Sequence, residues 1–379
     1  MIGLFATISL LVWLYMFAGH GQFWSTRETD DEPVEAPEAW PMVTAIVPAR
    51  DEAAVIGRSI ASLLTQDYPG EFRVILVDDS SSDGTASIAD TAAAAAGSSR
   101  LQIVSAAPLP KGWTGKLWAV AQGVDQSPAE ATWLWLTDAD IVHAPDTLRL
   151  LVARAIAARL VLNSSMALLR CESLAERALI PAFVFFFKML YPFARVNDPS
   201  AKMAAAAGGC MLVDRAALAR AGGIAVIADA IIDDCAMGAA MKKQGPIRLQ
   251  LSHRSVSIRP YGDWQDIGAM VSRSAYAQLH YSPLWLAGTL AGMGIIYLLP
   301  PLLALFGGGL PWFDGLMAWA IMAVLFQPML HYYRRSPLWG IAMPAIAGFY
   351  TWATIMSAVH YRQGRGGMWK GRAQARMPK

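Results

Sequence analysis

The sequence predicts an α/β domain built on a mostly parallel sheet, with one membrane helix before it and about three after it. Short apolar runs alternate with helix-patterned segments between residues 43 and 137, and long uncharged apolar stretches lie at both ends of the chain. Of the 379 residues, 55% are apolar and only 16% are charged, and mean hydropathy is +0.35. Soluble globular proteins carry about 25% charged residues. This balance argues against an ordinary soluble enzyme and against a disordered or fibrous chain.

The alternating segments predict the order of strands and helices in the domain. The predicted strands are Val43–Ala49, Val74–Asp79, Leu101–Ala106 and Trp133–Thr137. Apolar residues at helical spacing predict helices over Glu52–Gln66, Thr85–Ala96 and Lys116–Gln126. Strand–helix–strand alternation forms a parallel sheet with helices on both faces, and ligands bind beyond the carboxyl ends of its strands.

Acidic residues follow these strands at that functional edge. Asp79 ends the second strand, Asp138 and Asp140 follow the fourth, and Glu52 follows the first. No glycine-rich phosphate loop follows any strand, which argues against dinucleotide oxidoreductases and P-loop enzymes. Carboxylates hold a diphosphate through a divalent cation, so Asp138 and Asp140 predict a site for Mg²⁺ or Mn²⁺. Two alternatives to a binding role stay open. Asp79 could be a simple turn residue, and Glu52 could be an acid at a helix N-terminus.

Five motifs then occur in one order along the chain. They are Val47–Glu52, Val77–Thr85, Asp138–Asp140, Gly208–Gly209 and Asp233–Asp234. Their order and spacing, over about residues 43–279, resemble the family 2 glycosyltransferases of the GT-A fold. The segment Gly112–Ala119 is similar to membrane glycosyltransferases that act on isoprenoid lipids, most of all the hopene-associated group of bacterial hopanoid loci.

The resemblance implies a nucleotide-sugar donor, UDP-linked, and assigns it binding residues. Asp79, with Pro48 and Arg50 nearby, would hold the base and ribose, and Glu52 belongs to the same substrate-binding set. Lys116 would contact the donor, unless it only begins a surface helix.

The resemblance also assigns the residues around the diphosphate. Asp138 and Asp140 would bind the metal–diphosphate, which neutralises charge on the leaving group. Gly208 and Gly209 would let the backbone pass close to the sugar or acceptor, and a glycine-rich turn without a chemical role is the alternative.

Asp234 occupies the place of the family's catalytic base, which would deprotonate the acceptor hydroxyl in one inverting displacement. Asp233, a further substrate-binding residue, stands where the family usually has Glu. Capping of a helix that starts near Cys235 is the alternative for both acids. Processive members end the domain with Gln-x-x-Arg-Trp, and here only Arg273 matches, as a cation for the diphosphate. This departure favours a single transfer over polysaccharide synthesis.

Four apolar stretches predict membrane contact, at 1–19, 284–306, 310–330 and 338–359. The first is predicted to be an uncleaved anchor, because it lacks the basic start and cleavage site of a signal peptide. Residues 284–379 carry eight basic residues against Asp314, a net charge of +7, and the rest of the chain carries −5. This asymmetry favours anionic lipid headgroups over nucleic acid as a partner. The positive-inside rule predicts a multi-pass protein of the bacterial inner (cytoplasmic) membrane with its catalytic domain in the cytoplasm, and leaves open whether 338–359 crosses fully.

These features divide the chain into consecutive parts. They are an anchor (1–20), an acidic proline-containing linker (21–41), a GT-A domain (42–283), membrane helices (284–360) and a basic tail (361–379). Within the domain, aromatic residues around Lys188 predict an interfacial helix at about 179–196, with a core helix as the alternative. The three cysteines form no C-x-x-C motif and no disulfide framework, which indicates a reducing compartment.

The sequence as a whole predicts an inverting, metal-dependent glycosyltransferase. It would move a single sugar from a nucleotide-sugar to a membrane lipid, a hopanoid or another isoprenoid lipid. A processive polysaccharide synthase is one alternative. A non-catalytic membrane-anchored protein that binds nucleotide-sugar is the other, although the presence of Asp79, Asp138, Asp140 and Asp234 argues against it.

Overall fold

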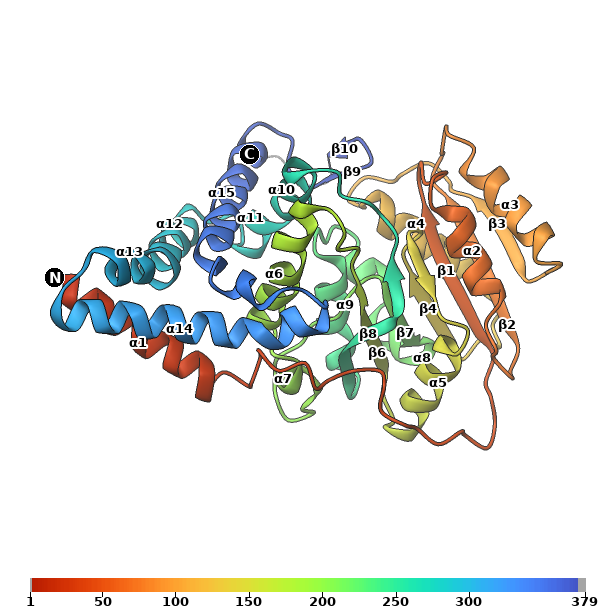
Figure 1. Ribbon diagram of the computed structural model, residues 1–379. Helices are drawn as coiled ribbons and strands as arrows, with labels where there is room; N and C mark the ends of the chain where they lie inside the picture. The colour runs from red at the N-terminus through yellow and green to blue at the C-terminus, as the bar shows by residue number, and fades with distance from the viewer. Residues whose placement is uncertain (1, 374–379) are drawn as a thin grey trace.

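The computed structural model describes residues 2–373, and its centre is an eight-stranded sheet of order β3-β2-β1-β4-β7-β6-β8-β5 (Figure 1). The strands are β1 (Val43–Ala49), β2 (Phe72–Asp78), β3 (Leu101–Ser105), β4 (Trp133–Thr137), β5 (Ile141–His143), β6 (Leu162–Leu168), β7 (Cys210–Asp214) and β8 (Ile247–Ser257). Only β7 and β5 run antiparallel to their neighbours in this sheet. A mostly parallel α/β sheet is therefore confirmed.

The helices of the domain lie between these strands. They are α2 (Ile56–Leu64), α3 (Thr85–Ala95), α4 (Gly115–Gln126), α5 (Thr147–Ala157), α6 (Leu174–Leu190), α7 (Phe193–Asn197), α8 (Arg215–Ala221), α9 (Asp233–Lys242), α10 (Trp264–Ser272) and α11 (Ala275–Gln278), with a 3₁₀ turn at Ile224–Ile227. The four strands and three helices predicted from periodicity are all present. Helix α2 starts later than predicted, because the chain turns over residues 51–55 and Asp51 adopts a φ of +49°.

The sheet separates two apolar cores, as its strand sequences require. Along β4, Trp133 and Trp135 belong to one buried cluster, whereas Leu134 and Leu136 belong to the other. Successive side chains of a strand point to opposite faces, so a strand buried on both faces is apolar throughout. Helices α2, α3 and α5 contribute to the first cluster, and α4, α6, α8 and α9 contribute to the second.

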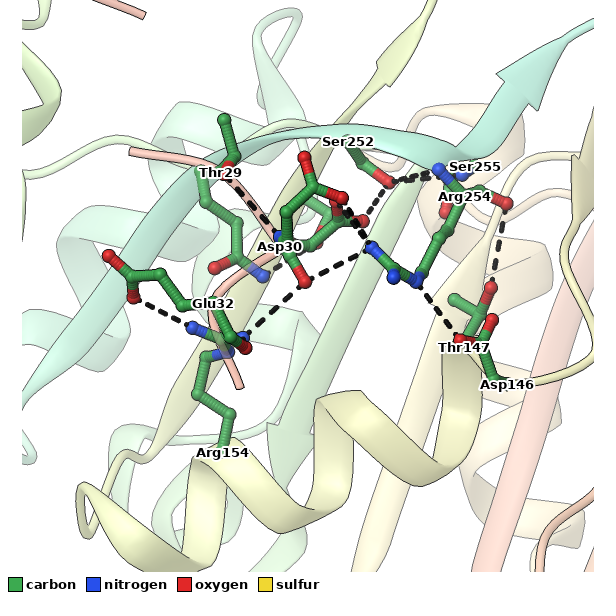
Figure 2. Close-up of polar contacts among 12 residues, drawn as sticks. Thr29, Asp30, Glu32, Asp146, Thr147, Arg154, Ser252, Arg254 and Ser255 are labelled. Atoms are coloured by element: carbon green, nitrogen blue, oxygen red, sulfur yellow. Dashed lines mark hydrogen bonds and ion pairs between the residues drawn. The ribbon is translucent and has the colours of Figure 1, made fainter. Parts of the chain in front are cut away.

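The acidic segment predicted as a linker lies along the outer part of β8 (Figure 2). Its backbone pairs with the strand, because Leu251 N donates to Glu28 O at 2.8 Å and Asp30 N donates to Leu251 O at 3.1 Å. Arg254 donates to the Asp30 carboxylate at 3.2 Å and to the Asp31 carboxylate at 2.8 Å, and Ser252 donates to Asp30. The segment therefore closes part of a sheet edge that would otherwise expose unpaired backbone groups.

Replacing Arg254 by glutamine should destabilise the protein by about 2 kcal/mol, because the nearly buried Asp30 carboxylate would lose its cationic partner. Arg149→Gln is the matched control, since its pair with Asp67 is exposed on both sides and such pairs contribute about 0–1 kcal/mol. Urea unfolding of the full chain followed by circular dichroism measures both changes. Equal losses in the two variants would contradict the prediction.

A helical bundle packs against one end of the sheet domain (Figure 1). It consists of α1 (Ile2–Ala18), α12 (Pro283–Met293), a π-helical stretch (Gly294–Leu298), α13 (Leu299–Phe306), α14 (Gly309–Tyr332), a 3₁₀ turn (Pro337–Gly340) and α15 (Met343–Arg362). Two of its helices, Pro283–Phe306 and Gly309–Tyr332, are long and apolar enough to cross a membrane. After α15, two short strands pair as a hairpin, β9 (Met368–Trp369) and β10 (Arg372–Ala373).

Helix α1 lies beside α14, although the two are far apart in sequence (Figure 1). The Thr7 hydroxyl donates to the Asp314 carboxylate at 2.6 Å, so the one acid of the apolar C-terminal region has a polar partner on α1. Trp13 donates to Ile296 O at 2.9 Å and packs edge-on against Tyr297. The two ends of the chain therefore form one bundle.

Helix α6 connects the sheet domain to this bundle. A capping box between Ser173 and Glu176 begins the helix, as its sequence requires. Phe185 is fully buried and contacts Phe326 of α14, and the Tyr350 hydroxyl of α15 donates to Leu179 O. The buried Lys188 pairs with Glu28 at 3.2 Å. These contacts correspond to the core-helix alternative for 179–196, and an interfacial role stays a prediction.

Candidate active site

The loops after β1 and β2 are joined by the residues predicted to bind a base and ribose. The Arg50 guanidinium lies 3.7 Å from the Asp79 carboxylate and donates to the Asp79 carbonyl. Asp79 N donates to Ala49 O at 2.8 Å, and the Asp51 carboxylate accepts the Ser82 amide at 2.8 Å. The two strand ends therefore form one rigid platform, and the Asp79 side chain within it is buried.

Lys116 stands at the centre of the acidic residues. Its Nζ lies 2.8 Å from the Asp138 carboxylate and 3.0 Å from the Asp233 carboxylate. Thr114 caps the N-terminus of α4 and so directs Lys116 into the site rather than onto the surface. Burial alone would lower the pKa of Lys116, but the two carboxylates outweigh burial and raise it, so the side chain stays a cation.

The pKa values of the two carboxylates that Lys116 joins shift in opposite directions. Burial raises the pKa of Asp138, and the negative charge of Asp140 raises it further. Lys116 lowers this pKa, but its effect is smaller than the other two together. For Asp233, burial would raise the pKa, but Lys116 and Arg273 lower it. Arg273 thus contributes to the lowered pKa of Asp233, and its role as a cation for the diphosphate stays a prediction.

Gly208 lies in the middle of this cluster, where a side chain would fill the space. A Cβ at this position would lie 3.4 Å from Lys116 Nζ, 3.6 Å from Asp234 Cβ and 3.8 Å from Asp138 Oδ2. Pro48, Lys116, Asp138, Gly208 and Asp233 also line one small cavity, of about 20 Å³. Gly209 instead faces an apolar neighbour, because a Cβ at this position would lie 3.3 Å from the Ile141 side chain. The Gly209 carbonyl accepts a hydrogen bond from the Thr137 hydroxyl.

Asp234 is held in the first turn of α9 and also reaches across to the Gly208 loop. Gly208 N donates to Asp234 Oδ2 at 3.2 Å, and Cys235 N donates to Asp234 Oδ1 at 2.7 Å. Burial, supplemented by the neighbouring Asp233 charge, raises the pKa of Asp234 to about 6. Such a carboxylate is ionised at neutral pH yet basic enough to accept a proton, which is the property a general base needs. A cap alone would not explain the contact with Gly208.

Arg259 is a site residue that the sequence reasoning missed. Its guanidinium donates to both Glu52 oxygens, at 2.7 and 2.9 Å, and to Asp140 Oδ2 at 2.9 Å. Ser257, at the end of β8, also donates to Asp140. Burial would lower the pKa of Arg259, but Asp140 and Glu52 raise it. No local motif marks Arg259, because it reaches the site only through the position of β8 in the sheet.

The C-terminal region supplies a second residue that the sequence reasoning did not place in the site. Lys370 Nζ lies 2.9 Å from Glu52 Oε1 and donates to Asp51 O at 2.9 Å. Glu52 thus pairs with two cations from distant parts of the chain. Its position before α2 makes it part of this network rather than a first-turn helix acid.

Asp138 and Asp140 fit a divalent cation by their chemistry. They are two carboxylates of neighbouring strand-end residues whose charges interact directly. Mg²⁺ is commonly bound by one or two carboxylates together with substrate phosphates, rather than by a cage made only of protein. Within residues 2–373, no cluster of three or more His, Cys, Asp or Glu forms such a cage. Oxygen ligands from a bound diphosphate would complete the coordination.

Gly238 sets the position of α9 and hence of Asp233 and Asp234. A Cβ at Gly238 would lie 2.6 Å from the Ala205 backbone carbon, so Gly238→Ala should destabilise the protein by about 1–3 kcal/mol. Gly292→Ala is the matched control, because a Cβ there meets nothing within 4 Å and alanine favours the helix by up to about 1 kcal/mol. Thermal unfolding distinguishes them, and the prediction is wrong if Gly238→Ala is as stable as Gly292→Ala.

Comparison with known proteins points to one family. Residues 44–222 match the family model described as Glycosyl transferase family 2. This range includes β1, β2 and β4 and the acids that follow them. No curated protein matches the chain.

Two solved structures are similar to this chain. The mannosyltransferase PcManGT from Pyrobaculum calidifontis, in complex with GDP-Man and Mn²⁺, aligns with a TM-score of 0.57 at 18% identity, over 95% of this chain and 99% of that chain. Glucosyl-3-phosphoglycerate synthase from Mycobacterium tuberculosis, in complex with Mn²⁺ and uridine-diphosphate-glucose, aligns with a TM-score of 0.40 at 19% identity, over 63% of this chain and 78% of that chain. The first alignment establishes a shared fold over nearly the whole length.

Proposed function

Because the chain carries a glycosyl transferase family 2 domain and is a glycosyltransferase, we propose that it transfers one sugar from a nucleotide-sugar, UDP-linked, to the hydroxyl of a membrane lipid. A hopanoid or another isoprenoid lipid is the proposed acceptor. The reaction inverts the anomeric configuration and requires Mg²⁺ or Mn²⁺. The observation that carries the proposal is the convergence of Lys116, Asp138 and Asp234 around Gly208.

Asp234 is the proposed general base. Its raised pKa and its fixed position against the Gly208 amide suit removal of a proton from the acceptor hydroxyl. As that oxygen attacks the anomeric carbon, the bond to the nucleoside diphosphate breaks on the opposite face. Gly208 places no side chain between Asp234 and Asp138, the two residues that the sugar would contact.

The leaving diphosphate would be stabilised by cations on the other side of the sugar. Asp138 and Asp140 would hold the divalent cation, which supplies charge neutralisation to the diphosphate. Lys116, beside Asp138, and Arg273, near Asp233, would add positive charge that stabilises the leaving diphosphate. Arg50 and Asp79 would hold the base and ribose on the platform formed by the β1 and β2 loops.

A lipid acceptor is supported by the apolar surface next to the domain. The two helices Pro283–Phe306 and Gly309–Tyr332 pass the length and hydropathy criteria for a span, and Leu284, Leu305 and Phe306 on them are exposed. Large exposed apolar patches mark protein or membrane contacts. We propose that α1 and α15 complete a multi-pass bundle and that the domain lies on the cytoplasmic side of a bacterial inner membrane. Lys370 of the basic tail pairs with Glu52, and we propose that the other basic residues of the tail face anionic lipid headgroups.

Transfer should depend on pH through Asp234. The base acts when deprotonated, so kcat/KM should fall about tenfold for each pH unit below about 6 and should reach a plateau above about pH 7. Initial rates from pH 5 to 8, with Mn²⁺ saturation verified at each pH, measure this profile. A rate that is constant from pH 5 to 8 would exclude Asp234 as the base.

The reaction itself can be tested with the purified full chain in nanodiscs. Radiolabelled UDP- and GDP-sugars are incubated with Mn²⁺ and a bacterial lipid extract, and products are separated by thin-layer chromatography and weighed by mass spectrometry. One added sugar on a lipid, released together with nucleoside diphosphate, is the expected result. Long polymers would indicate a processive synthase, and transfer only to a water-soluble acceptor would overturn the lipid assignment. Mass spectrometry of lipids from cells with and without the protein identifies the acceptor.

A further inference from the structure

A second and larger cavity lies near the carboxyl ends of β6 and β8. Its volume is about 560 Å³, and it is enclosed by the ends of β6 and β8, by α2 and by the turn after α14. Ser257 contributes to its wall while donating to Asp140. None of the residues predicted to bind the donor or to catalyse transfer lines this cavity.

Four arginines line the cavity, and three of them have no acidic partner. Arg170 is neutralised by Glu172 at 2.6 Å and by Glu176 at 2.8 Å. In the described part of the chain, no carboxylate lies within 4.0 Å of a guanidinium nitrogen of Arg58, Arg334 or Arg335. Three uncompensated guanidinium groups around one hollow favour an anion there.

The ring of Tyr332 forms part of the cavity wall. Tyr332, at the C-terminus of α14, is only 9% exposed, and its ring stacks on His253 with centroids 4.2 Å apart. The Tyr332 Oη is buried away from solvent, so the contacts to an anion in the cavity would come from the guanidinium groups.

The turn after α14 is built to present the two consecutive arginines. Arg334 adopts a φ of +53°, and Arg335 N donates to Leu330 O at 2.8 Å, which caps the end of the helix. Arg335 is further held by donation to Tyr333 O. The cationic groups are therefore anchored at the end of a helix that is long and apolar enough to reach across a bilayer.

We propose that this cavity binds a phosphate group carried by a lipid headgroup. Guanidinium groups match phosphate with two parallel hydrogen bonds. A volume of about 560 Å³ suits a small headgroup and lies within the usual range for small-molecule sites. Its position at the end of α14 points to a lipid as the source. That source depends on the membrane placement proposed above, whereas the phosphate site does not.

Native mass spectrometry of the full chain in a neutral detergent tests the proposal without any sugar transfer. Phosphatidylglycerol and phosphatidylcholine serve as lipid probes, and calorimetry with inorganic phosphate and glycerol 3-phosphate covers soluble sources. We expect the wild type to retain one phosphatidylglycerol. The combined changes Arg58→Gln, Arg334→Gln and Arg335→Gln should reduce its affinity at least tenfold, and Arg335→Gln alone should reduce it about threefold to fivefold.

A charge-matched control separates the cavity from the overall charge of the protein. Arg73, Arg100 and Arg220 are exposed, lie outside the cavity and have no ion pair within residues 2–373, so their combined change to glutamine should leave lipid retention unchanged. Undiminished phosphatidylglycerol binding by the cavity triple variant would overturn the site. Glycerol 3-phosphate binding as tightly as phosphatidylglycerol would keep the phosphate site and overturn the lipid source. If the triple variant does not fold, the single changes Arg334→Gln and Arg335→Gln carry the test.

Discussion

Asp234→Asn should reduce the rate of sugar transfer by about 10²–10⁴-fold, because that is the usual contribution of a positioned general base. Asparagine keeps an acceptor oxygen for the Gly208 amide, so the loop geometry should persist. Donor binding, measured by calorimetry with the intact nucleotide-sugar, should therefore change little. The loss should appear in kcat rather than in KM.

Stability provides the control for this variant. Since the pKa of Asp234 is raised in the folded protein, its ionised form is less favourable there than in the unfolded chain, and the folded state loses stability as pH rises from about 4 to about 6. Asp234→Asn removes that cost, so the variant should melt at or above the wild-type temperature at pH 7.5. Asp125→Asn, on the exposed face of α4, should change neither property. An Asp234→Asn enzyme with wild-type kcat would refute the assignment of the base.

Asp140→Asn should lower kcat/KM on the order of 10²–10³-fold, because a cation at the diphosphate supplies several kcal/mol of charge stabilisation. Asparagine can still accept from Arg259, so the link between Arg259 and Glu52 should remain. Binding of Mn²⁺ in the presence of nucleoside diphosphate, followed by electron paramagnetic resonance, should weaken in parallel with the rate.

The matched control for that variant is Asp90→Asn, on the exposed face of α3 and outside the site. It removes the same charge from the protein but should leave Mn²⁺ binding and the rate unchanged. Full activity of Asp140→Asn without added metal would contradict a role for Asp140 in holding the cation.

The sequence was informative where strand periodicity and strand-end chemistry coincide. β1 and β4 occur with the predicted bounds, and Asp79, Asp138 and Asp140 stand at the carboxyl edge where a parallel sheet places them. Lys116 and Asp233 were expected in one site, and the structure brings them to 3.0 Å. Local pattern was sufficient for the three strand-end acids, because each follows a strand directly, whereas Lys116 and Asp233 were assigned through the family resemblance.

Other features depend on contacts that no local pattern encodes. Arg259 reaches Asp140 only because β8 lies between β6 and β5, which is a property of the sheet order. The acidic segment was predicted to be a linker, yet three of its acids form ion pairs with residues that are distant in sequence. These pairs are Glu28–Lys188, Asp30–Arg254 and Glu32–Arg154. The roles of the site residues, the lipid acceptor and the membrane topology stay predictions for the experiments above.

The contact between Thr7 and Asp314 has a consequence for how the molecule is assembled. The two residues are 307 positions apart, so α1 can contact Asp314 only after all the residues between them have been synthesised. The sheet domain lies between them in sequence and can fold as a unit in the meantime. Closure of the bundle is then a late, long-range step, and such contacts slow folding. Removing α1 would leave Asp314 without its hydroxyl partner, so a shortened chain should assemble its C-terminal helices poorly.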